Sequence, residues 1–358
     1  MSVSKPLLAV TIGDPAGIGP EVIAGAWTDP RMHDWCRPLV VGHPEIMRRA
    51  CRLVAAGVKV VEVASPEEAS PAADVMPCLT ACQAESVDVP PGVVDARGGQ
   101  AAYDALVTAA RLALAGRIEA IVTAPLSKAA LWEAGHHYPG HTELLAELCG
   151  VDDFAMMLYL AHDEIVRGPA GLGVVHVTLH MSVRNALAAL SPASVLAKIH
   201  LADATMRPFT MAAVGTPPRI GVCALNPHGG EAGLFGDEET TVIAPAVDTA
   251  RAVGINAGGP YPTDTLMVRA RDGEFDAVVA MYHDQGHIAL KLLGMHRAVN
   301  VTLGLPIVRT SVAHGTAFDI AWQGVARTSS MIEAIRVACQ LAASRQRTTS
   351  STKSQIKS

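Results

Sequence analysis

The amino-acid sequence predicts an α/β protein with two domains. Its 358 residues exceed the usual size of a single domain. Short runs rich in β-branched residues alternate with Ala- and Leu-rich stretches that have helical periodicity. The β-branched runs are almost wholly apolar. Such runs are typical of strands covered on both faces, as in a parallel or mixed sheet. Because half of the residues are hydrophobic but only 4% are aromatic, we expect an aliphatic core.

The elements repeat the order strand, turn, helix. The first strand is expected at Leu7–Ile12, and a glycine-rich turn then leads into a helix with Pro20 and Glu21 in its first turn, where proline and carboxylates are favoured. The other expected strands are Pro38–Val41, Val58–Val63, Ala120–Ala124, Ala155–Leu160, Leu172–Leu179, Arg219–Leu225, Asp276–Tyr282 and Val299–Thr302. Further helices are expected at Gln100–Ala115, Pro192–Met206, Glu238–Val253 and Ser330–Ala343. The remaining residues, 345–358, are polar and are expected to form a disordered tail.

Composition excludes several classes of partner. A net charge of −6 and the absence of a basic cluster argue against nucleic acid. No apolar run reaches the roughly 18–20 residues of a membrane span, and the first residues lack the pattern of a secretory signal. The seven cysteines form no Cys-x-x-Cys pair, so we expect reduced, buried thiols and a cytoplasmic protein.

Three of the 14 histidines share one sequence context. His180, His228 and His283 each follow the end of a separate predicted strand, where open α/β sheets bind ligands. Converging there, neutral imidazoles could hold Zn²⁺ or another divalent ion; separate polar caps on the strand ends are the alternative. Asp264, and Asp284 beside His283, could orient a ligand or act as bases, and capping of turns is an equal possibility for each.

A second group of residues suits an anion. The string that contains His141 and Thr142 opens a predicted helix, whose free N–H groups favour phosphate. Lys291, Asn300 and Arg309 lie in a segment with few other charges. A basic side chain at the end of a buried strand needs an acidic partner. A bound phosphate or carboxylate would supply that partner, and an internal ion pair is the alternative.

Two glycine-containing loops could line a cleft. The loop over residues 13–19 has the spacing Gly-x-x-x-Gly-x-Gly, which is neither the dinucleotide fingerprint nor a P-loop. The loop over residues 314–321 offers a bend and several backbone donors, which would suit contact with a nucleotide.

Five strings taken together resemble the 4-hydroxythreonine-4-phosphate dehydrogenase family of vitamin B6 biosynthesis. They are Gly-Asp-Pro-Ala-Gly-Ile-Gly-Pro-Glu at 13–21, Gly-His-Thr-Glu at 140–143, Leu-Asn-Pro-His-Gly-Gly-Glu at 225–231, Ala-Met-Tyr-His-Asp-Gln-Gly at 280–286 and Gly-Leu-Pro-Ile-Val-Arg-Thr-Ser at 304–311. They occur in the family's order within residues 7–340. The loop at 314–321 also resembles the cofactor loop of isocitrate and isopropylmalate dehydrogenases.

The resemblance implies two α/β/α domains of the isocitrate/isopropylmalate dehydrogenase type, with the active site in the cleft between them. The first domain, on the cofactor side, is assigned to residues 1–135 and 306–344. The second, residues 136–305, would carry the metal, the substrate and the interface of a homodimer with a shared active site.

The site residues follow from the same resemblance. A divalent metal, Zn²⁺ or alternatively Mg²⁺, Mn²⁺ or Co²⁺, is expected on His180, His228 and His283. The phosphorylated substrate is expected on His141, Thr142, Lys291, Asn300 and Arg309. NAD or NADP is expected on Gly13, His314, Gly315, Ala317 and Asp319. Proton handling is assigned to Asp264, with Lys291 as the alternative. Two departures fall in the cofactor loop: Ala313 stands where the family often has an acid, and Trp322 where glycine is common.

The implied reaction is oxidation by NAD(P) of a secondary alcohol β to a carboxylate, followed by loss of CO₂. The substrate would be a 4-phosphorylated 3-hydroxy acid such as 4-phosphooxy-L-threonine. The string at 286–294 looks closer to a catabolic branch that includes 4-phospho-D-threonate 3-dehydrogenase. The same residue set would also suit a metal-dependent phosphate-ester hydrolase or a non-catalytic ligand sensor, and both functions are less favoured.

Overall fold

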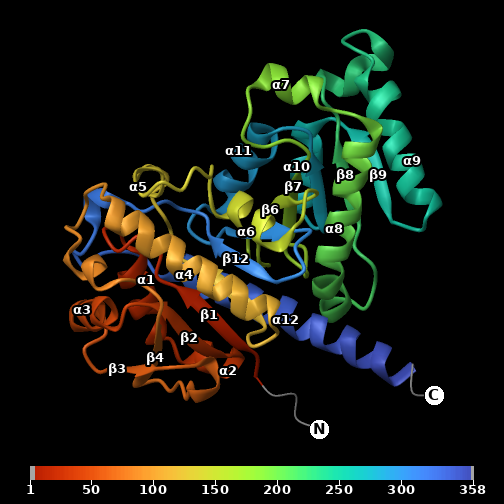
Figure 1. Ribbon diagram of the computed structural model, residues 1–358. Coiled ribbons are helices and arrows are strands. Elements are labelled where there is room, and N and C mark those ends of the chain that lie inside the picture. The colour runs from red at the N-terminus through yellow and green to blue at the C-terminus, as the bar shows by residue number, and fades with distance from the viewer. Residues whose placement is uncertain (1–4, 356–358) are drawn as a thin grey trace. The chain divides into compact units, whose positions relative to one another are not determined.

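The structure is a computed structural model that describes residues 5–355. The chain divides into two compact units, which we call the first unit (Met1–Asp152 with Leu305–Ser358) and the second unit (Asp153–Gly304). Both contain strands and helices (Figure 1), so the predicted α/β class is confirmed. No helix within residues 5–355 is both long enough and apolar enough to span a membrane.

The strands of the first unit are all parallel and lie in the order β3-β4-β2-β1-β5-β12. They are β1 (Leu7–Thr11), β2 (Arg37–Gly42), β3 (Lys59–Val63), β4 (Val75–Thr80), β5 (Ala120–Thr123) and β12 (Arg309–Val312). Their helices are α1 (Gly19–Trp27), α2 (Pro30–Trp35), α3 (Pro44–Val54), α4 (Ala96–Leu114), α5 (Lys128–Glu133), α6 (His141–Cys149) and α12 (Ser329–Gln355), with short turns η1 (Pro66–Glu68), η2 (Ala84–Asp88) and η5 (Phe318–Ile320).

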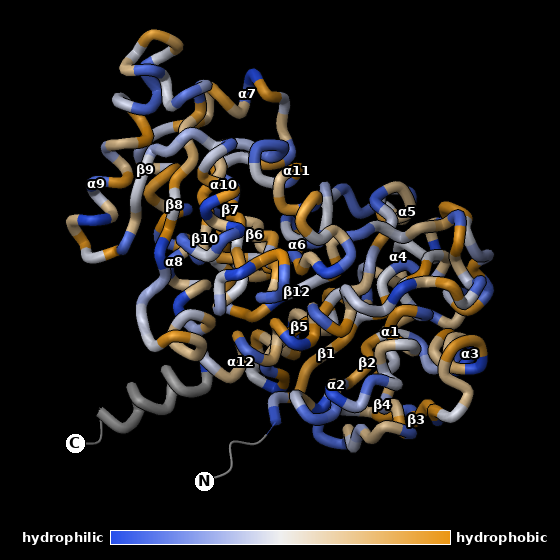
Figure 2. The backbone as a smooth tube through the Cα atoms, turned by 180° about the vertical axis from the view of Figure 1, so that it is seen from behind, coloured by the Kyte–Doolittle hydropathy of each residue, from blue (hydrophilic) through white to orange (hydrophobic). Residues whose placement is uncertain are grey.

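The core of the first unit is aliphatic, as predicted. Every residue of β1 and β5 is buried. Helix α4 packs on β1, β2 and β5, whereas α12 packs on β5 and β12. The hydrophobic stretches therefore gather along the strands (Figure 2). Burial of these Ala, Val, Leu and Ile side chains is the main favourable contribution to folding.

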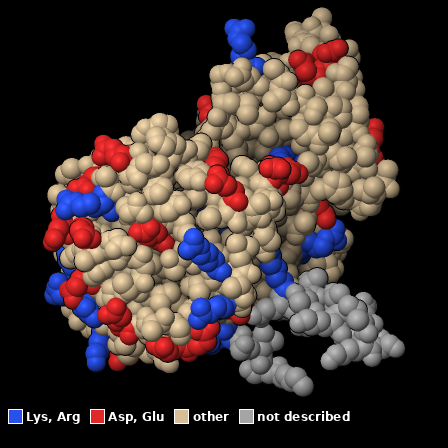
Figure 3. All heavy atoms as spheres, in the orientation of Figure 1, with Lys and Arg blue, Asp and Glu red and all other residues tan. Residues whose placement is uncertain are grey.

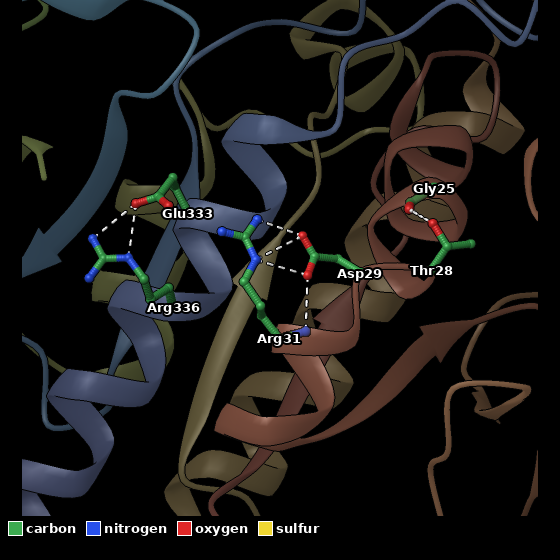
Figure 4. A network of polar contacts seen from close by, with 6 residues as sticks. All are labelled: Gly25, Thr28, Asp29, Arg31, Glu333 and Arg336. Atoms are coloured by element: carbon green, nitrogen blue, oxygen red, sulfur yellow. Dashed lines mark hydrogen bonds and ion pairs between the residues drawn. The ribbon is translucent and has the colours of Figure 1, made fainter. Parts of the chain in front are cut away.

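Local chemistry sets the ends of the elements. Asp29 caps α2 by accepting a hydrogen bond from the backbone N–H of Arg31 at 3.0 Å, and it also pairs with the Arg31 guanidinium at 2.6 Å (Figure 4). Pro20 and Glu21 lie in the first turn of α1, as expected. Acidic and basic side chains are interspersed on the face shown in Figure 3.

The strands of the second unit form a mixed arrangement in the order β11-β6-β7-β10-β8-β9. They are β6 (Ala155–Leu160), β7 (Leu172–His176), β8 (Ile220–Cys223), β9 (Ala257–Tyr261), β10 (Ala277–Ala280) and β11 (Val299–Leu303). β6 runs antiparallel to both neighbours, and the other pairs are parallel. The helices of the second unit are α7 (Val183–Ala188), α8 (Pro192–Ala213), α9 (Ala244–Ala252), α10 (Thr263–Arg271) and α11 (His283–Gly294), with turns η3 (Pro227–Gly233) and η4 (Glu239–Ile243).

Two boundaries differ from the sequence prediction. Residues 136–152 group with the first unit rather than the second, because α6 packs against α4. The predicted disordered tail is helical through Gln355 as part of α12, and residues 356–358 lie outside the described residues. The tail contains neither Gly nor Pro, and extending an existing helix costs far less than nucleating one.

Candidate active site

Three parallel strands of the second unit end at the same edge. β7, β10 and β8 are neighbours, so their carboxyl ends lie side by side. His180 follows β7, His228 lies in the η3 turn after β8, and His283 begins α11 directly after β10. The three predicted metal ligands thus follow three adjacent strands.

The rings of His180 and His283 are neighbours, with 6.1 Å between their centroids. Nδ1 of His283 lies 2.6 Å from Oδ1 of Asp284. Because a carboxylate only accepts hydrogen bonds, Nδ1 carries a hydrogen, and Nε2 is the ring nitrogen that could bind an ion. A histidine oriented by a carboxylate in this way is a typical metal ligand. The chemistry of this pair therefore fits a divalent ion.

His228 lies on a separate, exposed turn with left-handed backbone, at φ 56°. The turn is anchored at Asn226, whose backbone N–H donates to Oε1 of Glu239 at 2.7 Å. Burial raises the pKa of Glu239, but hydrogen bonds from Asn226 and nearby amides outweigh burial and leave that pKa lowered. Glu239 thus acts as a carboxylate that holds the η3 turn.

The part of the chain that the structure describes holds no complete metal site. Among residues 5–355, no group of three or more His, Cys, Asp or Glu side chains is arranged to hold a metal ion. His180 and His283 are the two predicted ligands that lie together. Metal ligation by His180, His228 and His283 remains a prediction.

A further histidine, absent from the predicted set, lies at this edge. His287 stacks on His283, with ring centroids 3.8 Å apart and an angle of 13° between the ring planes. Residues four apart share one face of a helix, so the spacing of His283 and His287 in the sequence was a signal that could have found it.

The other predicted residues of the second unit lie on different elements. Asp264 is exposed in the first turn of α10, where Oδ1 accepts a hydrogen bond from the Thr265 N–H at 2.7 Å. Lys291 is half-buried on α11. Asn300 lies on β11, and its buried Oδ1 has no hydrogen-bond partner among the described residues. That oxygen could accept a hydrogen bond from a substrate.

Arg309 is a buried cation in the first unit. It begins β12 with only 2% of its surface exposed, and Nη2 donates to Oγ1 of Thr123 at 2.6 Å. Burial lowers its pKa to about 9, although the nearby Glu143 carboxylate favours the charged form. A bound anion would offset this cost of burying the charge.

His141 and Thr142 begin α6, near Arg309. Burial and the positive charge of Arg309 hold the pKa of His141 well below its usual range. The exposed side chain of Lys128 also approaches: a Cβ built on Gly140 would lie 3.8 Å from its Cε. Lys128 is absent from the predicted set, although its place in the first turn of α5, just after β5, was visible in the sequence. The same Cβ on Gly140 would lie 3.5 Å from Oε2 of Glu143, so two cations, one carboxylate and a helix N-terminus surround this position. The excess of positive charge suits a phosphate.

The two glycine-containing loops meet in the first unit. The N–H of Ile18 donates to the carbonyl of Thr316 at 3.0 Å. Gly13 has φ +67°, and a Cβ there would lie 2.2 Å from the Pro125 carbonyl oxygen, so only glycine fits. Ala317 is also left-handed, at φ 44°.

The remaining predicted cofactor residues follow in the same loop. Nε2 of His314 lies 2.9 Å from Oγ of Ser330, while Gly315 and Asp319 are exposed.

Trp322 stands where the family commonly has glycine, and its backbone is left-handed, at φ 61°. Its backbone N–H donates to Glu21 at 2.7 Å, and its indole N–H donates to the Pro15 carbonyl at 2.8 Å. The Arg49 guanidinium lies 4.1 Å from the ring centroid. These contacts offset the strain of a bulky residue at positive φ. Nothing in the structure explains Ala313.

Asp14, in the first of these loops, is expected to make stability depend on pH. It is fully buried, and burial raises its pKa from 3.8 to about 6. Protonated Asp14 therefore contributes to the free energy of unfolding. This contribution is fully present below pH 3.8 and is lost as the pH rises through about 6. Asp14→Asn should raise the free energy of unfolding at about pH 7.5 by up to about 3 kcal/mol, with little change near pH 4. Urea unfolding at both pH values measures this.

The exposed Asp248→Asn is the matched control, since it removes the same charge from the surface of α9. It should leave the pH dependence as in the original chain. An Asp14→Asn variant with the original pH dependence would show that Asp14 is ionised at no cost.

Comparison with known proteins identifies the family. The model for "Pyridoxal phosphate biosynthetic protein PdxA" matches residues 34–338. A 4-hydroxythreonine-4-phosphate dehydrogenase from Trichlorobacter lovleyi is 43% identical over 348 residues, which cover 96% of this chain and 100% of that protein. A D-threonate 4-phosphate dehydrogenase from Pectobacterium atrosepticum is 45% identical over 337 residues, covering 94% and 99%.

A solved structure agrees with this. The crystal structure of 4-hydroxythreonine-4-phosphate dehydrogenase from Klebsiella pneumoniae superposes with a TM-score of 0.81 at 43% identity, covering 94% of this chain and 100% of that one. Since the likeness in sequence and in fold extends over nearly the whole chain, the protein belongs to the PdxA family, whose members named above are dehydrogenases.

Proposed function

We propose that this protein is a metal-dependent, NAD(P)-linked dehydrogenase that oxidises and decarboxylates a 4-phosphorylated 3-hydroxy acid such as 4-phosphooxy-L-threonine. The observation that supports it most is the buried Arg309 beside His141 and the α6 N-terminus, because this surrounding favours a phosphate monoester over an uncharged substrate. The two relatives act, by their names, on phosphorylated compounds.

Each residue has a distinct task in this proposal. His141, Thr142 and Arg309 bind the phosphate, and Lys291 and Asn300 contact the substrate. A divalent ion held by His180, His228 and His283 would supply Lewis-acid polarisation of the substrate hydroxyl. Asp264 accepts the hydroxyl proton, with Lys291 as the alternative.

The cofactor residues are Gly13, His314, Gly315, Ala317 and Asp319. The nicotinamide would supply the hydride acceptor. The exposed carboxylate of Asp319 would accept a hydrogen bond from a ribose hydroxyl and repel a 2′-phosphate. We therefore expect NAD to be preferred over NADP.

A second candidate substrate is 4-phospho-D-threonate. The identity to D-threonate 4-phosphate dehydrogenase, 45%, is as high as that to the 4-hydroxythreonine-4-phosphate enzyme. Both candidates carry the phosphate that Arg309 would bind, so the phosphate site does not distinguish between them.

A turnover assay tests the function and the substrate together. Purified protein is mixed with each of the two phosphorylated substrates, each with NAD and with NADP, before and after chelation. We expect reduced nicotinamide to form with NAD on one substrate, to stop on chelation and to return when Zn²⁺ or Mn²⁺ is added. Release of phosphate without a cofactor would instead identify a hydrolase, and tight binding without any product would identify a sensor.

We also propose that the protein is a cytoplasmic homodimer whose two chains share each active site. Large apolar side chains are exposed on the elements around the histidines, including Leu234 and Phe235 near η3 and Ile288 and Leu292 on α11. Leu292 is 82% exposed. An apolar surface of this kind is typical of an interface. Sedimentation of the full chain would show the dimer.

A further inference from the structure

His176 and His287 form a buried hydrogen-bonded pair beside His283. His176 ends β7 and His287 lies one turn into α11, and they are 1% and 6% exposed. Nδ1 of His287 lies 3.0 Å from Nε2 of His176. Nδ1 of His176 lies 3.4 Å from the Met156 carbonyl oxygen, which can only accept. His176 therefore donates through Nδ1 to Met156 and accepts at Nε2 from the Nδ1–H of His287.

The backbone around the pair leaves room for this contact. A Cβ on Gly286 would lie 2.5 Å from Nε2 of His176 and 2.7 Å from Cγ1 of Val174. Any larger residue at 286 would therefore force the His176 ring to move. The side chain of Gln285 anchors the same turn of α11 by donating to the Ala224 carbonyl at 2.8 Å. The first turn of α11 is thus held on both sides.

His287 in turn covers one face of the His283 ring. The two rings are nearly parallel, with centroids 3.8 Å apart. At its edge the His283 ring is held by a hydrogen bond between Nδ1 and Oδ1 of Asp284. Two independent contacts thus restrict rotation of His283 about its side-chain bonds.

We propose that His287, locked by its hydrogen bond to His176, is a positioning residue that fixes the ring of His283 for metal binding. The inference rests on the proposed metal centre. In the absence of His287, the His283 ring would sample several rotamers, and the cost of ordering it would be subtracted from the metal affinity. Neither histidine of the pair needs to touch the ion.

Cobalt binding by the full-length, metal-free protein tests this. Co²⁺ is titrated into the original chain and into His287→Leu, His287→Phe and His200→Ala, and the visible absorption of the bound ion is followed. His287→Leu fills similar space but removes the stacked ring and the hydrogen bond, so it should weaken binding by roughly 10- to 100-fold. His287→Phe keeps the stacked ring and should bind more tightly than His287→Leu. His200 is exposed on α8, so His200→Ala should bind Co²⁺ with the affinity of the original chain.

Circular dichroism confirms that each variant is folded. Unchanged affinity and spectrum in a folded His287→Leu variant would overturn the inference, as would His287→Phe binding no better than His287→Leu. If His287→Leu fails to fold, His287→Phe provides the test instead. Because Phe keeps the stacked ring, we expect this variant to bind Co²⁺. A folded His287→Phe variant that does not bind Co²⁺ would overturn the proposal. Failure of the original chain to bind Co²⁺ would instead overturn the metal centre itself, and the positioning role with it.

Discussion

Arg309→Ala is expected to weaken binding of the phosphorylated substrate by about 2–4 kcal/mol, or roughly 30- to 1,000-fold. The side chain is 2% exposed and its charge is disfavoured by burial. A phosphate bound there forms charge-assisted hydrogen bonds in a water-poor site, and removal of the guanidinium leaves the phosphate without its main partner. Calorimetric titration with the substrate, together with KM, measures the loss.

Two further variants make the result specific. Arg309→Lys keeps the positive charge but loses the planar fork, so it should lie between Ala and the original chain. Arg117→Ala removes an arginine whose exposed ion pair with Glu67 lies on the surface, and it should leave substrate affinity unchanged. An Arg309→Ala protein that binds substrate as tightly as the original would remove Arg309 from the phosphate site.

His228→Ala is expected to reduce turnover by on the order of 10³-fold or more, because loss of a metal ligand removes several kcal/mol of Lewis-acid stabilisation. The fold should change little, since the side chain is exposed and the η3 turn is anchored through Asn226 and Glu239 instead. Bound metal, determined by elemental analysis, should fall together with kcat, while the thermal midpoint stays near that of the original chain.

His200→Ala again serves as the control, because it removes an exposed histidine of the same unit. A His228→Ala protein that retains both its metal and its activity would refute the assignment of His228 as a ligand. Loss of activity with full retention of metal would give His228 a role in substrate contact instead.

Most strands were predictable because their own residues carry the signal. β1, β5, β6, β7 and β10 are buried at every position, and continuous apolar runs of this kind are easily recognised. Three strands were not predicted. β4 contains Pro77, β9 contains two glycines and a proline, and β12 begins Arg-Thr-Ser. In β4 and β9 the proline and glycine residues oppose strand formation, and pairing with neighbouring strands overrides this preference. β12 is only four residues long and begins with a charged residue, so it lacks a continuous apolar run.

The helices show the same division. The predicted start of α8 at Pro192 is confirmed because Ser191 and Ser194 form a capping box there, but the helix continues past Met206 to Ala213 with Pro208 inside it. The predicted helix at Glu238–Val253 starts instead with a π-helical turn over Glu239–Ile243. Caps are local signals, whereas the extent of a helix depends on what it packs against.

The sequence by itself determined the α/β class, most of the strands and the place of His180, His228 and His283 after three of them. Strand periodicity and turn residues are properties of neighbouring positions, so these conclusions need no knowledge of distant contacts. Only the tertiary structure decided that Lys128 approaches the start of α6 and that His287 is hydrogen-bonded to His176. These contacts join residues up to 111 positions apart. They depend on strand order and on the packing of helices, which no local pattern specifies.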